Sequence, residues 1–291
     1  MLLLGTLFVT ACFTQPSRAM AQDAEKPKAE NKPAGEIFFA SDRSGSWRVW
    51  SIHPDGSDPR QVIEGAKDDE MDVDPNFSSN GKKIVFTSTR GGTTGIWMAN
   101  SDGSGVTRIC EGRQAEWSPD DKKIAFAKND KIFVRELESG KEKQIVPDSY
   151  KICSVPAWSP EGKKIAFACR WEAGNGLFIV SAEGGEEPIK IFDKKGACEP
   201  HWSPDGSLLA YETETHICTI QPDGQKPRQI TSWGGVQRYA QWSPDGKRFV
   251  FCHGNSEKGP WLLYSMPSTG GPPSAATPLT EEGSNMNPDW R

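Results

Sequence analysis

The stretch YAQWSPDGKRFVFCHG, residues 239–254, is typical of a strand, a tight turn and a second strand. Its Ser-Pro-Asp-Gly turn suits a hairpin, because proline presets the backbone φ of the first turn position, aspartate bonds its own backbone and glycine accepts a left-handed conformation. Nearly the same hairpin occurs at 156–170 and at 200–214. The chain therefore repeats one structural unit.

The aromatic residue before each turn sets the period of the repeat. These anchor residues follow one another at intervals of 40 to 48 residues: Phe77, Trp117, Trp158, Trp202, Trp242 and Trp290. An apolar strand follows each turn, then comes a second strand and turn, such as IWMANSDG at 96–103, and a fourth short strand, such as TRIC at 107–110. Four short antiparallel strands in every forty or so residues indicate the blade of a β-propeller.

The two ends of the repeat region are complementary. Residues 35–63 contain the last three strands of a unit without an anchor strand, whereas residues 285–291 contain an anchor strand with nothing after it. We therefore predict an all-β fold over residues 36–291, a six-bladed β-propeller of four-stranded antiparallel blades. Its ring would close by pairing of the C-terminal strand with the N-terminal segment.

The first 35 residues have a different character. The apolar run at 2–13 is too short to cross a bilayer as a helix, and the small-x-small pattern at 19–21 follows it. We interpret residues 1–21 as a signal peptide and residues 22–35 as a charged, Pro-containing linker, which predicts export to the periplasm. VTAC, ending at Cys12, also resembles a lipobox, so a lipoprotein anchored through Cys12 is the alternative. The mature chain contains no expected transmembrane segment.

Composition and motifs argue against several classes of function. The 291 residues carry 34 Lys and Arg against 39 Asp and Glu, a net charge of −5, so there is no basic excess for nucleic-acid binding. The sequence has neither a Gly-x-Ser-x-Gly elbow nor a His-Glu-x-x-His motif, and its four histidines are scattered. The acidic stretch KDDEMDVD at 67–74 lacks the turn and ligand spacing of a calcium loop. We expect no catalytic residue, no metal and no cofactor.

The repeat resembles the TolB-type propeller family, which is related in shape to the WD40 repeat. The resemblance rests on PxWSPDGxxIAF followed by IWxMxxDGSxxxxIT and covers residues 36–291, without the N-terminal α/β domain of TolB. It implies a non-catalytic, monomeric protein-binding scaffold linked to cell-envelope integrity, with an envelope protein or a peptidoglycan-associated (Pal-like) lipoprotein as partner. Two alternatives stay open: a carbohydrate-active lyase or hydrolase that uses the acidic stretch and His201 in the channel, and a stand-alone regulatory propeller of a peptidase system.

The resemblance also places the binding surface. In TolB-like blades the anchor strand is the innermost one, so residues shortly before each anchor are expected at the mouth of the central channel. This set is mixed in charge and rich in hydrogen-bonding groups: Asp72, Asp74, Arg113, Gln114, Glu199, Arg238, Tyr239, Asn285 and Asn287.

The hairpin register suggests one disulfide among the six cysteines that follow the signal peptide. A three-residue loop at 160–162 would place Cys153 directly opposite Cys169, at a separation slightly wide for a bridge but adjustable at a non-hydrogen-bonded pair. Two reduced thiols are the alternative. The same register rule places Glu70 opposite Arg90 as a cross-strand ion pair.

Overall fold

The computed structural model describes residues 35–171, 174–193 and 196–291. The predicted signal peptide, Cys12 and all of the predicted linker except Gly35 lie outside these residues. Within them, four sets of strands can be distinguished by their place in each blade. The innermost strands are β4 (Asp72–Phe77), β8 (Arg113–Trp117), β12 (Lys151–Trp158), β16 (Cys198–Trp202), β20 (Val236–Trp242) and β24 (Asn285–Trp290). The second strands are β1 (Ile37–Ser41), β5 (Lys83–Ser88), β9 (Lys123–Lys128), β13 (Lys164–Trp171), β17 (Leu209–Thr213) and β21 (Arg248–Gly254).

The outer half of each blade is built in the same way. The third strands are β2 (Arg48–Ile52), β6 (Gly95–Asn100), β10 (Lys131–Glu136), β14 (Gly174–Ser181), β18 (His216–Ile220) and β22 (Leu262–Pro267). The outermost strands are β3 (Arg60–Gln61), β7 (Thr107–Glu111), β11 (Glu142–Gln144), β15 (Ile189–Asp193), β19 (Arg228–Gln229) and β23 (Thr277–Pro278). Two 3₁₀ turns, Arg90–Gly92 and Pro273–Ala275, complete the described elements.

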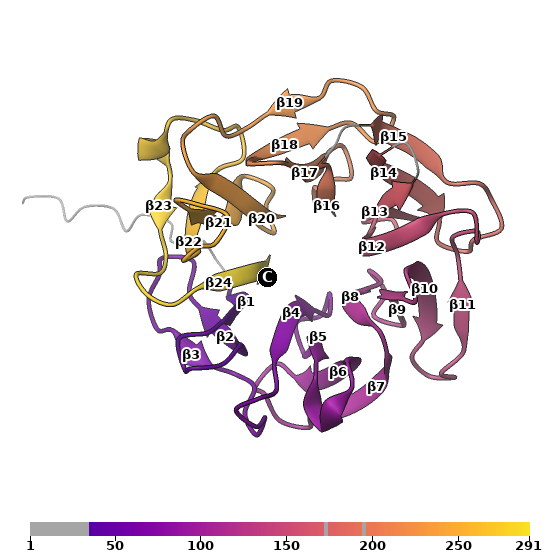
Figure 1. Cartoon of the computed structure of the whole chain (residues 1–291), viewed down its shortest axis with the longest axis horizontal. Helices are drawn as coiled ribbons and strands as arrows, with labels where there is room; N and C mark the ends of the chain where they lie inside the picture. The colour runs from indigo at the N-terminus through magenta and orange to yellow at the C-terminus, as the bar shows by residue number, and fades with distance from the viewer. Residues whose placement is uncertain (1–34, 172–173, 194–195) are drawn as a thin grey trace, which may run out of the picture. The chain divides into compact units, whose positions relative to one another are not determined.

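The strands form six four-stranded antiparallel sheets arranged around a central axis (Figure 1). Five sheets are made of consecutive strands, and the sixth has the order β24–β1–β2–β3. Strand β24 pairs with β1 from Ile37 opposite Trp290 to Ser41 opposite Asn285, and the backbones of Glu36 and Arg291 exchange hydrogen bonds beyond this ladder. The prediction of a six-bladed propeller closed by its two ends is confirmed.

The anchor residues end the innermost strands and join neighbouring blades. The indole Nε1–H of Trp117 donates to the carbonyl oxygen of Asn76 in the preceding blade at 3.2 Å. Trp202 bonds Ala157 in the same way at 3.1 Å. Trp242 bonds His201 in the same way at 3.2 Å, whereas the buried Nε1 of Trp158 has no hydrogen-bond partner among the described residues. Three anchor tryptophans therefore bury a large apolar ring and also satisfy the N–H across the blade boundary.

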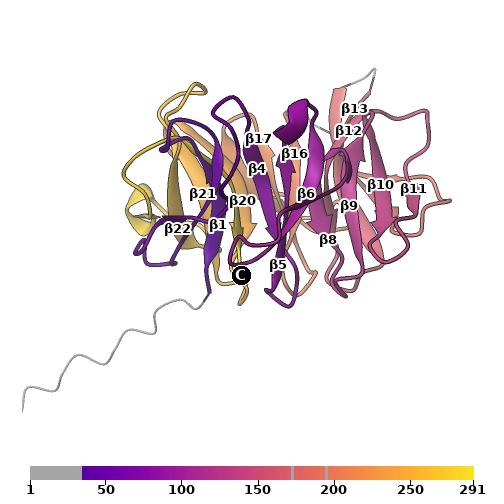
Figure 2. The ribbon, with the colours of Figure 1, turned by 90° about the horizontal axis from the view of Figure 1, so that it is seen from below.

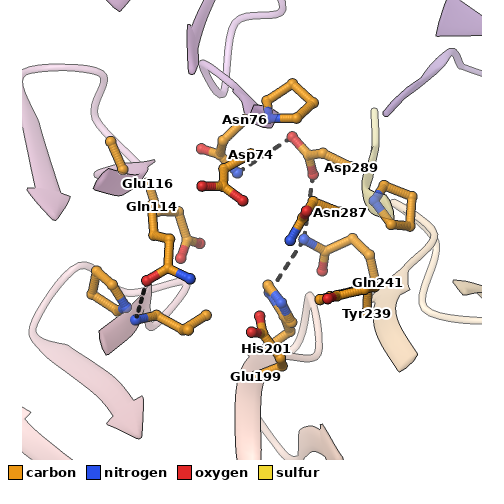
Figure 3. Close-up of a pocket in the computed structure, with 15 residues that line it drawn as sticks. Asp74, Asn76, Gln114, Glu116, Glu199, His201, Tyr239, Gln241, Asn287 and Asp289 are labelled. Carbon is orange, nitrogen blue, oxygen red and sulfur yellow. Dashed lines mark hydrogen bonds between the residues drawn. The ribbon is translucent and has the colours of Figure 1, made fainter. Parts of the chain in front are cut away.

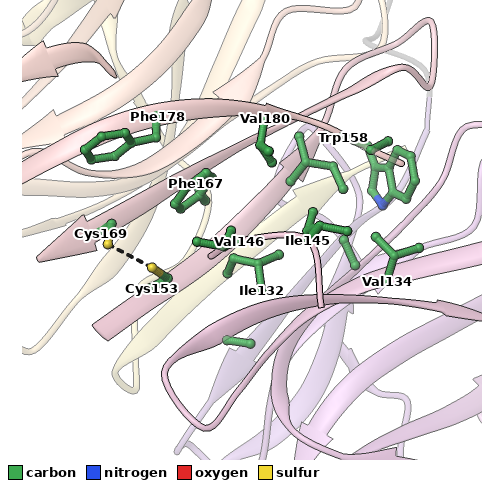
Figure 4. Close-up of a cluster of buried hydrophobic side chains, with 14 residues drawn as sticks. Ile132, Val134, Ile145, Val146, Cys153, Trp158, Phe167, Cys169, Phe178 and Val180 are labelled. Atoms are coloured by element: carbon green, nitrogen blue, oxygen red, sulfur yellow. Dashed lines mark hydrogen bonds between the residues drawn. The ribbon is translucent and has the colours of Figure 1, made fainter. Parts of the chain in front are cut away.

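Apolar side chains fill the spaces between adjacent sheets. Counted from the blade of β4–β7, strands β8–β11 form the second blade and β12–β15 the third. The cluster between these two blades, shown in Figure 4, combines Ile132 and Val134 of β10 with Trp158, Phe167 and Phe178 of the third blade. Successive side chains of a strand point to opposite faces of its sheet, so each blade directs apolar residues toward both of its neighbours. Each blade is thus held by its neighbours rather than by a core of its own.

The register between β12 and β13 differs by one residue from the prediction near the turn but agrees with it at the cysteines. The N–H of Ser159 donates to the carbonyl oxygen of Lys164, so the loop contains four residues and Trp158 lies opposite Ile165. A bulge between Ser154 and Ala157 shifts the ladder back, and Cys153 does face Cys169. The expected three-residue loop is wrong, but the bulge compensates because it adds one unpaired residue to β12.

Candidate functional site

Every innermost strand carries a bulge three residues before its anchor. The residue at that position has a left-handed backbone, with φ between 49° and 57°: Asp74, Gln114, Val155, Glu199, Tyr239 and Asn287. The ladders to β5, β9, β13, β17, β21 and β1 shift register at or next to these residues. Left-handed backbone is uncommon outside glycine, and bulges re-aim side chains. The sixfold recurrence shows that the bulge belongs to the blade design.

The bulges help to place two rings of side chains around the axis (Figure 3). We call the six left-handed residues the bulge ring. The anchor ring is formed by residues that directly precede the anchors: Asn76, Glu116, His201, Gln241 and Asp289. The cavity that these rings line has a volume of about 60 Å³. It has room for roughly four or five water molecules, at 10–15 Å³ of probe-occupied volume for each. A peptide or a sugar ring does not fit there.

The anchor ring is a hydrogen-bond network that links the blades. A carboxylate oxygen of Asp289 accepts the backbone N–H of Phe77 at 2.7 Å and the amide of Asn76 at 3.3 Å. Asn76 in turn accepts the N–H of Trp117 at 3.0 Å, and Glu116 accepts the N–H of Trp158 at 3.3 Å. These side chains satisfy backbone groups of the next blade, which is a structural role.

The electrostatics of the channel favour neutral side chains. Burial raises the pKa of Glu116 to about 8, against the opposing effect of Arg291. Burial and the neighbouring carboxylates of Glu212 and Asp74 raise the pKa of Glu199 well above its usual value. Burial also lowers the pKa of His201 to about 4, so its ring is neutral at pH 7. Removal of these groups from bulk water is the common cause.

The structure brings five of the predicted mouth residues together around the channel: Asp74, Gln114, Glu199, Tyr239 and Asn287. Two others directly precede a bulge-ring residue: Arg113 is the first residue of β8, and Arg238 is the third residue of β20. Arg113 has a half-exposed side chain 3.7 Å from the carboxylate of Asp130, and the guanidinium of Arg238 lies 5.5 Å from the ring centre of Trp261.

The last two predicted mouth residues, Asp72 and Asn285, are fully buried. The carboxylate of Asp72 accepts bonds of 2.7 and 3.0 Å from Arg90, and the amide of Asn285 donates to the carbonyl oxygen of Trp261 at 2.9 Å. Both are occupied by structural contacts. The predicted partner of Arg90 was wrong, because the guanidinium pairs with Asp72 and the Glu70 carboxylate accepts the N–H groups of Lys67 and Gly91.

The residues of the carbohydrate-active alternative, the acidic stretch at 67–74 and His201, do not all meet at one site. Asp68 and Asp69 are exposed to solvent, whereas Asp74 and His201 line the same cavity from different rings. The Nδ1 atom of His201 lies 3.3 Å from the amide of Gln241. In the ranges that the structure describes, no group of three or more His, Cys, Asp or Glu side chains is placed to hold a metal ion.

Two apolar residues at the mouth were missed by the sequence reasoning. Met71 directly precedes β4 and is 42% exposed, and Ile152, the second residue of β12, is 44% exposed. Ile152 also has a left-handed backbone with φ of 51°, which is an outlier for a β-branched side chain. The available signal was their position at the start of the innermost strands, just outside the repeated motif.

These features define a closed six-bladed propeller with a small, water-sized cavity between the two rings of its channel. Residues 114–290 match the family model of the TolB beta propeller domain, and the chain belongs to this family. The match covers more than half of the chain, including five of the six anchors.

Solved structures share this fold at low sequence identity. TolB from Acinetobacter baumannii is 18% identical, with a TM-score of 0.74 over 89% of this chain and 67% of that chain. An oligogalacturonate lyase from Vibrio parahaemolyticus is also 18% identical, with a TM-score of 0.52 over 86% of this chain and 73% of that chain. At this level of sequence identity, the similarity shows a shared fold only.

A curated relative matches only locally. Dipeptidyl-peptidase 5 from Porphyromonas endodontalis is 35% identical over 80 residues, which are 26% of this chain and 11% of the peptidase. The chain thus spans a small part of that protein. None of the helices in the described part of the chain has the length and apolar character needed to cross a membrane.

Proposed function

We propose that this chain is an exported, non-catalytic propeller that binds a Pal-like envelope lipoprotein at the mouth of its channel and so contributes to envelope integrity. Membership of the TolB propeller family supports a role in protein binding. The observation that carries the proposal is the exposure of apolar side chains at this one end of the innermost strands.

The mouth patch consists of Met71, Arg113 and Ile152, which belong to three successive blades. Each lies at the start of an innermost strand, β4, β8 or β12 (Figure 2 shows these strands from the side). Methionine and arginine are enriched in protein interfaces, whereas an exposed isoleucine gains most by being covered. The one other large apolar side chain exposed in the described residues, Ile189, is on the outermost strand β15.

The patch is held in place before any ligand arrives. The N–H of Met71 donates to the hydroxyl of Thr89 at 2.8 Å, and the N–H of Thr89 donates to the carbonyl oxygen of Met71 at 3.0 Å. The neighbour of Ile152, Cys153, donates its N–H to the carbonyl oxygen of Asp130 at 2.9 Å. A pre-ordered surface loses less conformational entropy on binding.

The size of the channel favours a ligand outside it. The cavity between the two rings, of about 60 Å³, holds water but no sugar ring. A protein surface needs no entry into the channel, because it can cover the mouth patch and the rim.

The test is a binding titration of the full chain with a purified peptidoglycan-associated lipoprotein. We expect Met71→Asp, Ile152→Asp and Arg113→Glu each to weaken binding about tenfold or more, as truncation of central interface residues does. The matched control is Ile189→Asp, which places the same charge on an exposed isoleucine far from the axis.

Two results would contradict the proposal. Wild-type protein that does not bind the lipoprotein would refute the partner. Binding that is weakened equally by Ile189→Asp, or unaffected by the three mouth variants, would refute the site.

A further inference from the structure

Within the third blade, two cysteine side chains on the adjacent strands β12 and β13 face each other (Figure 4). The ladder pairs Cys153 directly with Cys169, and their Sγ atoms are 2.8 Å apart. The N–H of Cys153 donates to Asp130 of the preceding blade and not to β13. Cys153 and Cys169 therefore form a non-hydrogen-bonded pair, the type in which opposed side chains come closest.

We propose that Cys153 and Cys169 form a disulfide that ties the innermost strand of the third blade to its neighbour. A disulfide bond is about 2.05 Å long, so the two sulfur atoms need to approach by less than about 1 Å. Small side-chain rotations are sufficient for such a movement.

The surroundings of the pair limit the choice of partner. Cys153 is fully buried and Cys169 is 2% exposed, and both belong to the apolar cluster between the second and third blades. The other four described cysteines lie in or against different clusters of the core: Cys110, Cys198, Cys218 and Cys252. Within the described ranges, Cys169 is thus the sulfur that Cys153 meets.

The bond would form by thiol–disulfide exchange, a step that rests on the proposed export. One cysteine thiolate attacks a disulfide-bearing oxidant and forms a mixed disulfide, and the second thiolate then displaces the oxidant's sulfur. The two cysteines lose two protons and two electrons, and the oxidant's disulfide becomes two thiols. Because the pair is buried, the exchange precedes the closure of the second blade over the third.

The thiolate is the attacking species in this exchange, which takes place before the native pair is buried. Once formed, the bond would close the loop 153–169 and fix the strand end that carries Ile152.

The test uses the full chain refolded in a glutathione redox buffer, alkylated and digested with trypsin without reduction. We expect residues 152–163 to remain linked to residues 165–170. Reduction of the refolded protein should lower its Tm by about 5–10 °C, since the bond restricts the unfolded chain. Each variant is compared with itself in oxidised and reduced form, so that any packing defect cancels. Cys153→Ala and Cys169→Ala should abolish the redox difference, and the control Cys252→Ala should keep it.

Separate, alkylated peptides containing Cys153 and Cys169 after oxidative refolding would overturn the proposal. So would a redox-dependent Tm that persists in the Cys153→Ala/Cys169→Ala double variant. Neither result bears on lipoprotein binding, and loss of lipoprotein binding does not affect the peptide map. The two proposals can therefore fail independently.

Discussion

At the anchor end of the channel, side chains bond the backbone of the neighbouring blade, whereas two residues earlier on the same strands most side chains line the central cavity. Asp289 of the anchor ring accepts the N–H of Phe77 and the amide of Asn76, and it is 1% exposed. Tyr239 of the bulge ring lines the cavity with a partly buried side chain. The comparison teaches that the anchor ring ties neighbouring blades together, whereas the bulge ring lines the cavity between them.

The strongest test of this comparison is a pair of substitutions that keep the side-chain shape, one in each ring. Asp289→Asn should lower the free energy of unfolding by about 2–3 kcal/mol, because both carboxylate oxygens accept buried donors, so the new amide group would face either the N–H of Phe77 or the amide of Gln241. Tyr239→Phe should change it by less than about 0.5 kcal/mol. Urea denaturation measures both values. Equal losses at the two positions would remove the distinction between the rings.

The second test uses pH. The folded-state pKa of Glu116, about 8, lies above its ordinary value of 4.5, so the folded protein holds this proton more tightly than the unfolded chain. The associated stability is fully present below about pH 4.5 and is lost as pH rises through about 8. We expect Glu116→Gln to reduce the fall in unfolding free energy over this range by up to about 5 kcal/mol, since each pKa unit corresponds to about 1.4 kcal/mol.

The matched control for the pH profile is Glu138→Gln, at an exposed turn position. Denaturant titrations at several pH values would follow both variants beside the wild type. A profile that Glu116→Gln leaves as steep as that of the wild type would show that Glu116 is not protonated in the folded channel.

The smallest expected effect concerns the turns beyond the anchors. In three blades a turn glycine, Gly162, Gly206 or Gly246, packs against the turn proline of the preceding blade. Between the blades of β4–β7 and β8–β11, Ser79 takes the place of the proline and Asp121 that of the glycine. The Asp121 carboxylate accepts the N–H groups of Ser79 at 2.6 Å and Asn80 at 3.1 Å. Serine has the backbone N–H that proline lacks, and Asp121 provides the acceptor for it.

Asp121→Asn should cost about 0.5–1 kcal/mol, since the amide keeps one acceptor oxygen and tolerates the left-handed backbone. In a Ser79→Pro background, which lacks one donor, the same substitution should cost less. Asp58→Asn is the control, because Asp58 has a similar φ of 57° and its carboxylate lies 3.9 Å from the His53 ring. A double-mutant cycle without coupling between positions 79 and 121 would contradict this interpretation.

The comparison of the rings also shows how far the candidate site was accessible from the sequence. Distance from the anchor correctly indicated Asp74, Glu199 and Tyr239 as channel residues. It could not separate them from Asp72, which is on the same strand but is occupied by Arg90 from the adjacent hairpin. Side-chain partners that come from other strands leave no trace in the spacing of one strand.

The sequence by itself determined the period, the anchors, the number of blades and the closure of the ring. These depend on local turn chemistry and on alternating strands, which recur about every forty residues. Only the tertiary structure decided the bulges and the exposure of Met71 and Ile152. The reason is physical: a bulge forms where six strands must converge on one axis, and that convergence exists only after neighbouring blades have packed together.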